Sequence, residues 1–299
     1  DKHSINEIIN IIKYTYPNIQ FNIMNINENN KLYYEQHLHS PGFPIRVDDT
    51  NYIKQKHIHC LVHYRAIMLV LASNINIVDK NCRNTWKKYM NIDPTIKVFF
   101  VYGKLNNDLT DYDPTSDLIY NDVIECYPMF IDKTIKAMET IDSLFTYDFF
   151  IRTNLSTFWD FNKLHLHLNE LPTTNCYSGD GPLPCYTPAG YYLSGTDTIV
   201  TPEMIHSIVE NKHLIRYDMV EDAAMGLYFN GVLKAPMLPN RICFFEDINN
   251  NNIDIINERI MNAIENNKDH YRVKNIVMRE VIDLLIYNKL LNIVYNIKV

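Results

Sequence analysis

The chain has 299 residues, of which 46% are hydrophobic, and its formal net charge is −7. This length and apolar content suffice for one large core, or for a core with a smaller lobe. The acidic balance argues against a general nucleic-acid-binding protein, which would show a basic surplus. No apolar run reaches the length of a membrane span, so we expect no membrane segment in this chain.

The first 64 residues lack a regular pattern. Isoleucines at helical spacing over residues 5–12 predict a short helix, and residues 19–26 alternate as in a short strand. The stretch from residue 28 to residue 64 is polar and rich in histidine. We expect residues 1–64 to be an N-terminal extension that packs on a main domain over residues 65–299.

Strands and helices alternate regularly after residue 65. The pattern predicts strands at 66–73, 96–103, 117–124 and 147–152, and helices at 81–90, 130–145 and 159–171. Such alternation predicts an α/β fold of Rossmann-like type, with a mostly parallel central sheet flanked by helices.

The C-terminal part is less regular. Residues 191–211 predict a strand, a short strand and then a helix that starts near Pro202, and residues 217–231 predict an apolar helix preceded by two acids. Two amphipathic helices follow at 254–266 and 279–296. No Pro/Gly/Ser-rich linker divides the chain, which favours a single main domain.

Several common motifs are missing. The sequence contains no P-loop, GxGxxG, HExxH or GxSxG pattern, and its six cysteines form no CxxC pair. His57, His59 and His63 are spaced as a metal cluster could be, but no acid or cysteine lies at ligand spacing. A hydrogen-bonded polar stretch is the alternative interpretation, and we favour it.

The strand expected at 147–152 ends in polar residues. Arg152, Thr153, Asn154 and Ser156 follow an apolar run without a carboxylate among them. A strand that delivers polar groups at its C-terminal end is how an α/β sheet builds a ligand site.

Two further stretches carry charge. Glu221 and Asp222 precede a helix, where they favour the helix dipole or, alternatively, provide a general base for a sugar hydroxyl. In a strand, His270, Arg272 and Lys274 share one face, which is either an exposed charged surface or a clamp for phosphate.

The order of these segments resembles a known family. "NCRNTWKKYM" keeps Arg83, Thr85 and Trp86, and it is followed by "VFFVYG", "FIDKTIKAMET", "YLSGTDTIVTPEM" and "EDAAMG". In order and spacing they resemble GT-A glycosyltransferases of the β-1,3-galactosyltransferase and Fringe type (glycosyltransferase family 31), over residues 65–235.

The resemblance implies an enzyme that transfers a sugar, with inversion, from a nucleotide-sugar donor to a hydroxyl of a glycan or glycoprotein acceptor. It implies a UDP-linked donor at the C-terminal edge of the sheet, with Asp222 as the usual base and Glu221 as the alternative. It also places Ser194, Gly195, Thr196 and Asp197 near the donor sugar or the acceptor. We expect the donor nucleotide and its diphosphate to be bound by Ser73, Arg83, Arg152, Thr153, Asn154, Ser156, His270, Arg272 and Lys274.

The chain departs from the family at its metal motif. The acidic triplet of the family falls on Asn154, Leu155 and Ser156, and a neutral amide or hydroxyl holds Mn²⁺ or Mg²⁺ weakly. Because the leaving diphosphate still needs its charge stabilised, cations must supply that stabilisation. We therefore expect a metal-independent transferase, with Mn²⁺ or Mg²⁺ left open as a cofactor.

Other functions remain open at this stage. The missing acids also suit a catalytically inactive module that binds nucleotide-sugars or glycans, whereas a nucleotidyltransferase would usually show a Gly-rich loop and Mg²⁺-binding acids. The single Asn-X-Ser/Thr sequon, at Asn154, argues against passage through a glycosylating compartment, so we expect a soluble domain in the cytoplasm rather than a secreted one. The composition, rich in Asn and Ile, and the missing metal motif would also suit a viral protein, which could act at a viral factory.

Overall fold

The computed structural model describes residues 21–23, 60–73, 76–104, 113, 115–124, 130–184, 190–240, 243–245, 253–266, 269–275 and 278–298. The expected helix over residues 5–12 lies outside these residues, as do His57 and His59. Among the described helices, none has the length and apolar character needed to cross a bilayer.

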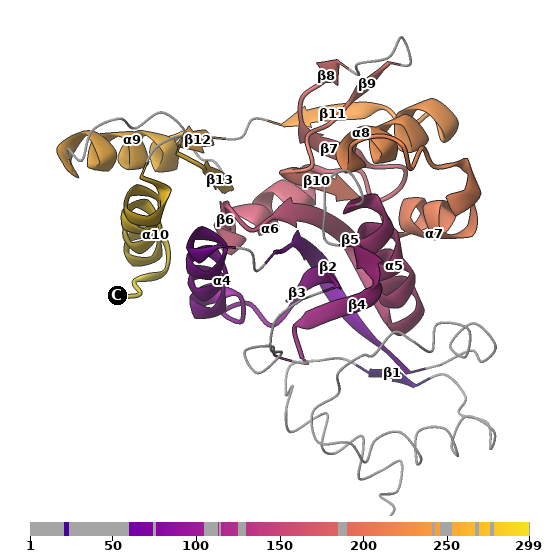
Figure 1. Cartoon of the computed structure of the whole chain (residues 1–299), viewed down its shortest axis with the longest axis horizontal. Helices are drawn as coiled ribbons and strands as arrows, with labels where there is room; N and C mark the ends of the chain where they lie inside the picture. The colour runs from indigo at the N-terminus through magenta and orange to yellow at the C-terminus, as the bar shows by residue number, and fades with distance from the viewer. Residues whose placement is uncertain are drawn as a thin grey trace, which may run out of the picture.

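The protein is an α/β structure built on a mostly parallel, eight-stranded sheet, compatible with a Rossmann-like fold (Figure 1). Its path runs β11–β7–β10–β5–β2–β3–β4, and β1 pairs with β2. Neighbours among β2, β3, β4 and β5 are parallel, whereas β10 runs antiparallel to both β5 and β7. The strands are β1 Phe21–Ile23, β2 Cys60–Leu71, β3 Ile96–Lys104, β4 Asp117–Ile124, β5 Phe145–Asn154, β7 Tyr177–Asp180, β10 Asp197–Val200 and β11 Met237–Asn240.

The central strand β2 is buried on both faces. Met68 and Val70 contribute to the core on one face, while Ile67 and Leu69 contribute to the core on the other. A strand covered by helices on both sides needs a continuous apolar run rather than an alternating one, which is the pattern of "AIMLVL".

Two layers of helices cover the sheet (Figure 1). Helices α4, α6, α9 and α10 contribute to one core, and α5, α7 and α8 contribute to the other. The helices are α4 Ile77–Tyr89, α5 Phe130–Leu144, α6 Phe161–Glu170, α7 Pro202–Glu210, α8 Glu221–Gly226, α9 Ile253–Glu265 and α10 Arg279–Tyr295, with a 3₁₀ turn at Lys212–Leu214 and a π-helix at Leu227–Val232.

A small second sheet brings the C-terminal part of the chain to the end of β5. It has the order β12–β13–β6, in which β6 (Thr157–Trp159) follows β5 after a two-residue turn. Strand β13 (His270–Val273) is antiparallel to β6 and parallel to β12 (Cys243–Phe245). A separate hairpin joins β8 (Leu183–Pro184) to β9 (Tyr191–Tyr192).

The structure confirms the predicted strands and helices in order and differs at some boundaries. β2 starts at Cys60, so the predicted domain boundary between residues 64 and 65 falls inside a strand. The added residues pair with the start of β5, where Val62 lies opposite Phe145 and His63 opposite Thr146, and the His63 ring contacts the Thr146 hydroxyl at 3.1 Å. Trp159 was expected in a helix but belongs to β6, and Asp160 caps α6 by accepting hydrogen bonds from the next backbone N–H groups.

Candidate functional site

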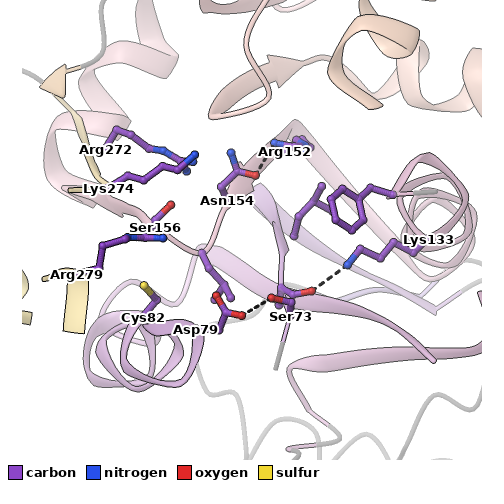
Figure 2. A pocket seen from close by; sticks show the side chains of 14 residues that line it. Ser73, Asp79, Cys82, Lys133, Arg152, Asn154, Ser156, Arg272, Lys274 and Arg279 are labelled. Carbon is purple, nitrogen blue, oxygen red and sulfur yellow. Dashed lines mark hydrogen bonds between the residues drawn. The ribbon is translucent and has the colours of Figure 1, made fainter. Parts of the chain in front are cut away.

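A pocket lies where the chain reverses its direction along the sheet. After β2 the chain passes through α4 to β3 on one side, and it returns through α5 to β5 on the other side of β2. A cavity of about 220 Å³ opens there, at the C-terminal ends of β2 and β5 (Figure 2). Such switch points are where open α/β sheets bind their ligands.

The pocket is lined by basic side chains from four different segments. Arg152 comes from β5, Lys133 from α5, Arg272 and Lys274 from β13 and the residues after it, and Arg279 from the start of α10. Figure 2 shows Arg272 and Lys274 reaching toward Asn154 from one side, with Lys133 on the opposite side. Among the described residues lining the pocket, Asp79 alone carries a carboxylate, so the pocket favours an anion.

Two helices direct their N-termini at the same pocket. The contacts between them show that α4 and α10 run parallel, because Cys82 lies 3.5 Å from the Tyr287 hydroxyl and Tyr89 stacks on Tyr295 with ring centroids 5.2 Å apart. Asp79 and Arg279, in their first turns, both line the pocket. The partial positive charge of each N-terminus adds to the field of the basic side chains.

A buried carboxylate holds Arg152 in place. Its Nε donates to Glu221 Oε1 at 2.9 Å, its Nη2 also contacts Glu221, and its Nη1 donates to Asn154 Oδ1 at 2.9 Å. Burial raises the pKa of Glu221 and the charge of Arg152 opposes this shift. Glu221 is thus the counter-ion of Arg152, which is a correction to its expected part as an alternative base.

A similar arrangement fixes Arg279. Its Nε donates to Asp283 Oδ2 at 2.9 Å, and Asp283 Oδ1 accepts hydrogen bonds from the backbone and side chain of Asn275 at 3.1 and 2.8 Å. Since Asn275 directly follows Lys274, this carboxylate ties the start of α10 to the segment that bears two other pocket cations.

Lys133 is the most buried of the pocket cations, with 2% of its surface exposed. Its Nζ donates to the Ala72 carbonyl at 2.9 Å and lies 4.9 Å from the centre of the Phe130 ring. At the same edge the Ser73 hydroxyl donates to Asp79 at 2.5 Å. These contacts join the residues that follow β2 to α5 and α4, two of the three helices that line the pocket.

Six of the predicted donor-binding residues line this pocket. They are Ser73, Arg152, Asn154, Ser156, Arg272 and Lys274. Sequence reasoning missed Lys133 and Arg279. Arg279 could have been noticed from its position. An arginine in the first turn of a helix is unfavourable for the helix dipole, so its presence there indicates another role.

Three other predicted donor residues point elsewhere, which corrects those expectations. Arg83 pairs with the buried Asp117. Thr153 alternates with its pocket-lining neighbours along β5 and donates instead to the Thr196 carbonyl at 2.6 Å. His270 is fully buried and does not line the pocket.

The residues predicted to lie near the donor sugar or the acceptor, 194–197, also differ from one another in their surroundings. Asp197 is fully buried and accepts a hydrogen bond from the Asp180 backbone N–H at 3.0 Å. Ser194 Oγ lies 2.7 Å from Thr196 Oγ1. Gly195 packs so closely on Arg152 that a Cβ would overlap the guanidinium, and its N–H donates to Asp222 Oδ2 at 3.2 Å.

Asp222 is therefore a partly buried carboxylate beside the Arg152 end of the pocket. Within the described residues, no group of three or more His, Cys, Asp or Glu side chains is arranged to hold a metal ion. No protein-family model matches the chain, and no curated protein matches it.

Proposed function

We propose that this protein is an inverting glycosyltransferase of the GT-A type, with a UDP-linked sugar donor bound between the ends of β2 and β5. The observation that carries the proposal is the convergence of five basic side chains and two helix N-termini on one pocket at the switch point of the sheet. The order of the family 31-like segments supports the same assignment.

The charges in the pocket suit a diphosphate. Apart from Lys133, which donates to the Ala72 carbonyl, the basic groups come from β5, from β13 and the residue after it, and from the start of α10, so they can contact both phosphates. The arginine guanidinium groups can bind phosphate oxygens in pairs. By the resemblance, Asn154 and Ser156 correspond to the position of the family's metal motif, and Arg152 is hydrogen-bonded to Asn154. In this proposal the cations stabilise the charge that develops on the leaving diphosphate.

The other end of the pocket suits a nucleoside. Leu71, Ala72 and Phe130 supply apolar surface there, and Ser73 and Asp79 supply polar groups next to it. A nucleotide, with a flat ring that can pack on apolar side chains, polar groups on the base and ribose, and phosphates at the other end, matches this distribution.

Asp222 is our candidate base. It would accept the proton of an acceptor hydroxyl while that oxygen attacks the anomeric carbon and the bond to the diphosphate breaks. Asp222→Asn should therefore abolish sugar transfer and leave donor affinity nearly unchanged, because the base acts in the chemical step.

Calorimetric titration with UDP and a panel of UDP- and GDP-sugars, in EDTA and then in Mn²⁺, tests the proposal. We expect binding in EDTA, and at least tenfold weaker binding after Arg272→Ala, which removes a charge-assisted contact worth about 1.5–3 kcal/mol. Arg216→Ala is the matched control, since Arg216 pairs with Asp218 on the surface. No binding of any nucleotide, or equal loss in both variants, would refute the pocket assignment.

An inactive nucleotide-sugar- or glycan-binding module is the second candidate. The observation in its favour is that Arg152 engages Glu221 and that Asp197 is buried in the core, which removes two carboxylates from the proposed chemistry. Binding of a donor without transfer or hydrolysis, across the whole panel, would support this alternative.

A further inference from the structure

Strand β13 brings two of the pocket cations to the end of β5. Its register against β6 sets Arg272 opposite Thr157, and the Val273 N–H donates to the Ser156 carbonyl at 2.8 Å. Because successive side chains of a strand point to opposite faces, a shift of one residue would turn Arg272 away from the pocket. Something must therefore fix this short strand in its register.

His270, at the first position of β13, makes the contacts that can do so. Its Nδ1 lies 2.6 Å from Asp269 Oδ1 and its Nε2 lies 3.1 Å from Asp197 Oδ2. Its ring stacks on Trp159 with centroids 4.6 Å apart and is fully buried. Asp197 belongs to β10 of the main sheet, so this imidazole connects the two sheets.

The charges around the imidazole favour its protonated form. Burial disfavours the charge, but the carboxylates of Asp269 and Asp197 together raise the pKa of His270 to about 10. Asp180 adds a further negative charge nearby, and the pKa of Asp269 is lowered by His270 despite burial. The contact between Nε2 and Asp197 has the distance of an ion pair but not the geometry of a hydrogen bond, whereas Nδ1 is hydrogen-bonded to Asp269, so the charge of the imidazolium is attracted to both carboxylates.

We propose that His270, held between Asp197 and Asp269, is a positioning residue that fixes β13 in register and so places Arg272 and Lys274 at the phosphate end of the pocket. This inference rests on the proposed function only for the identity of the ligand. It replaces the expectation that His270 itself contacts the donor, because Trp159 and the two carboxylates enclose the ring.

His270→Gln tests the proposal, since glutamine keeps a donor and much of the volume but cannot carry the charge. His165→Gln is the matched control, because His165 also pairs with a carboxylate, that of Asp93, at 2.5 Å. His165 lies on α6, which contributes no lining residue to the pocket. If His270→Gln does not fold, Asp197→Asn is the second variant. It removes one of the two carboxylate charges and leaves the shape of the side chain nearly unchanged.

The first readout is independent of any ligand. Amide hydrogen exchange of Arg272 and Val273 should accelerate at least tenfold in His270→Gln, while exchange in α5 stays within twofold and His165→Gln leaves β13 unchanged. Unchanged exchange in β13, or acceleration throughout the molecule, would overturn the positioning role.

The second readout is affinity for UDP and for inorganic pyrophosphate. His270→Gln should weaken both by about tenfold in the wild-type background, and by less than about twofold once Arg272 and Lys274 are both alanine, because coupled residues are not additive. Equal losses in both backgrounds would overturn the inference. Wild-type protein that binds neither probe would refute the proposed ligand, while the exchange result would still decide the role of His270 in β13.

Discussion

Replacing Glu221 by glutamine should destabilise the protein and at the same time strengthen its binding of phosphate ligands. The side chains of Arg152 and Glu221 are 6% and 3% exposed, so solvent screens their attraction little. Removing one partner of a buried pair leaves a buried charge uncompensated, which costs about 3–5 kcal/mol. Glutamine keeps one oxygen to accept from Nε of Arg152, so we expect the lower end, about 3 kcal/mol.

The free energy of unfolding from urea titration measures this loss, provided that the slope with denaturant is unchanged. Asp218→Asn is the control, because Asp218 pairs with Arg216 at a site where both side chains are more than half exposed. The free energy of unfolding of Asp218→Asn should stay close to that of the wild type, because exposed ion pairs contribute little to stability. The affinity for UDP should rise in Glu221→Gln by up to about tenfold, since the charge of Arg152 is then no longer offset while the glutamine oxygen still accepts from its Nε and keeps the guanidinium in place.

A Glu221→Gln variant as stable as the wild type would show that Arg152 and Glu221 are not a charged pair. Burial raises the pKa of Glu221 while Arg152 opposes the shift. If burial prevailed at neutral pH, Glu221 would already be protonated, and glutamine would replace it without loss of charge. Stability and UDP affinity would then both stay unchanged.

Three further variants test the packing around Gly226, the phosphate site at Asn154 and the charge of His270. Gly226→Ala should lower the free energy of unfolding by about 1–3 kcal/mol, because a Cβ would overlap the Tyr192 side chain and lie 2.9 Å from its Cα, whereas Gly231→Ala, with nothing within 4 Å, should not. Asn154→Asp should weaken UDP binding in EDTA by about tenfold and Mn²⁺ should restore it; an unchanged affinity in EDTA would place the phosphates elsewhere. The stability that His270 adds should be complete below pH 6.5 and be lost as pH rises toward its folded pKa of about 10, so the difference in unfolding free energy between wild type and His270→Gln should shrink with rising pH; a constant difference would contradict this.

The central fold could be predicted because its strands are covered on both faces. Continuous apolar runs such as residues 66–71 and 98–102 have no other stable place than the middle of a parallel sheet. The short strands β7, β11 and β12 were missed. They have three or four residues each, too few for a periodic pattern to distinguish them from loop, and their pairing partners lie far away in sequence.

Part of the pocket could be predicted because some of its residues directly follow a buried strand. Arg152 and Asn154 follow a buried strand, so their position at the edge of the sheet follows from local sequence. The burial of His270 does not follow from local sequence. Alternation places His270 on the same strand face as Arg272, but it does not indicate which neighbouring elements cover that face. Burial under Trp159 and beside Asp197 depends on how the second sheet meets the main sheet.

Buried carboxylates behind the pocket explain how a chain with a negative net charge can present a basic site. Glu221 holds Arg152, Asp283 holds Arg279, and Asp197 holds His270 at the start of the strand that carries Arg272. Each of these carboxylates is buried, and none is among the residues that line the pocket. Carboxylates placed behind the cations restrain them without occupying the space that a ligand needs. An anion entering the pocket therefore meets cations whose positions are already fixed, so less of its binding energy goes into ordering side chains.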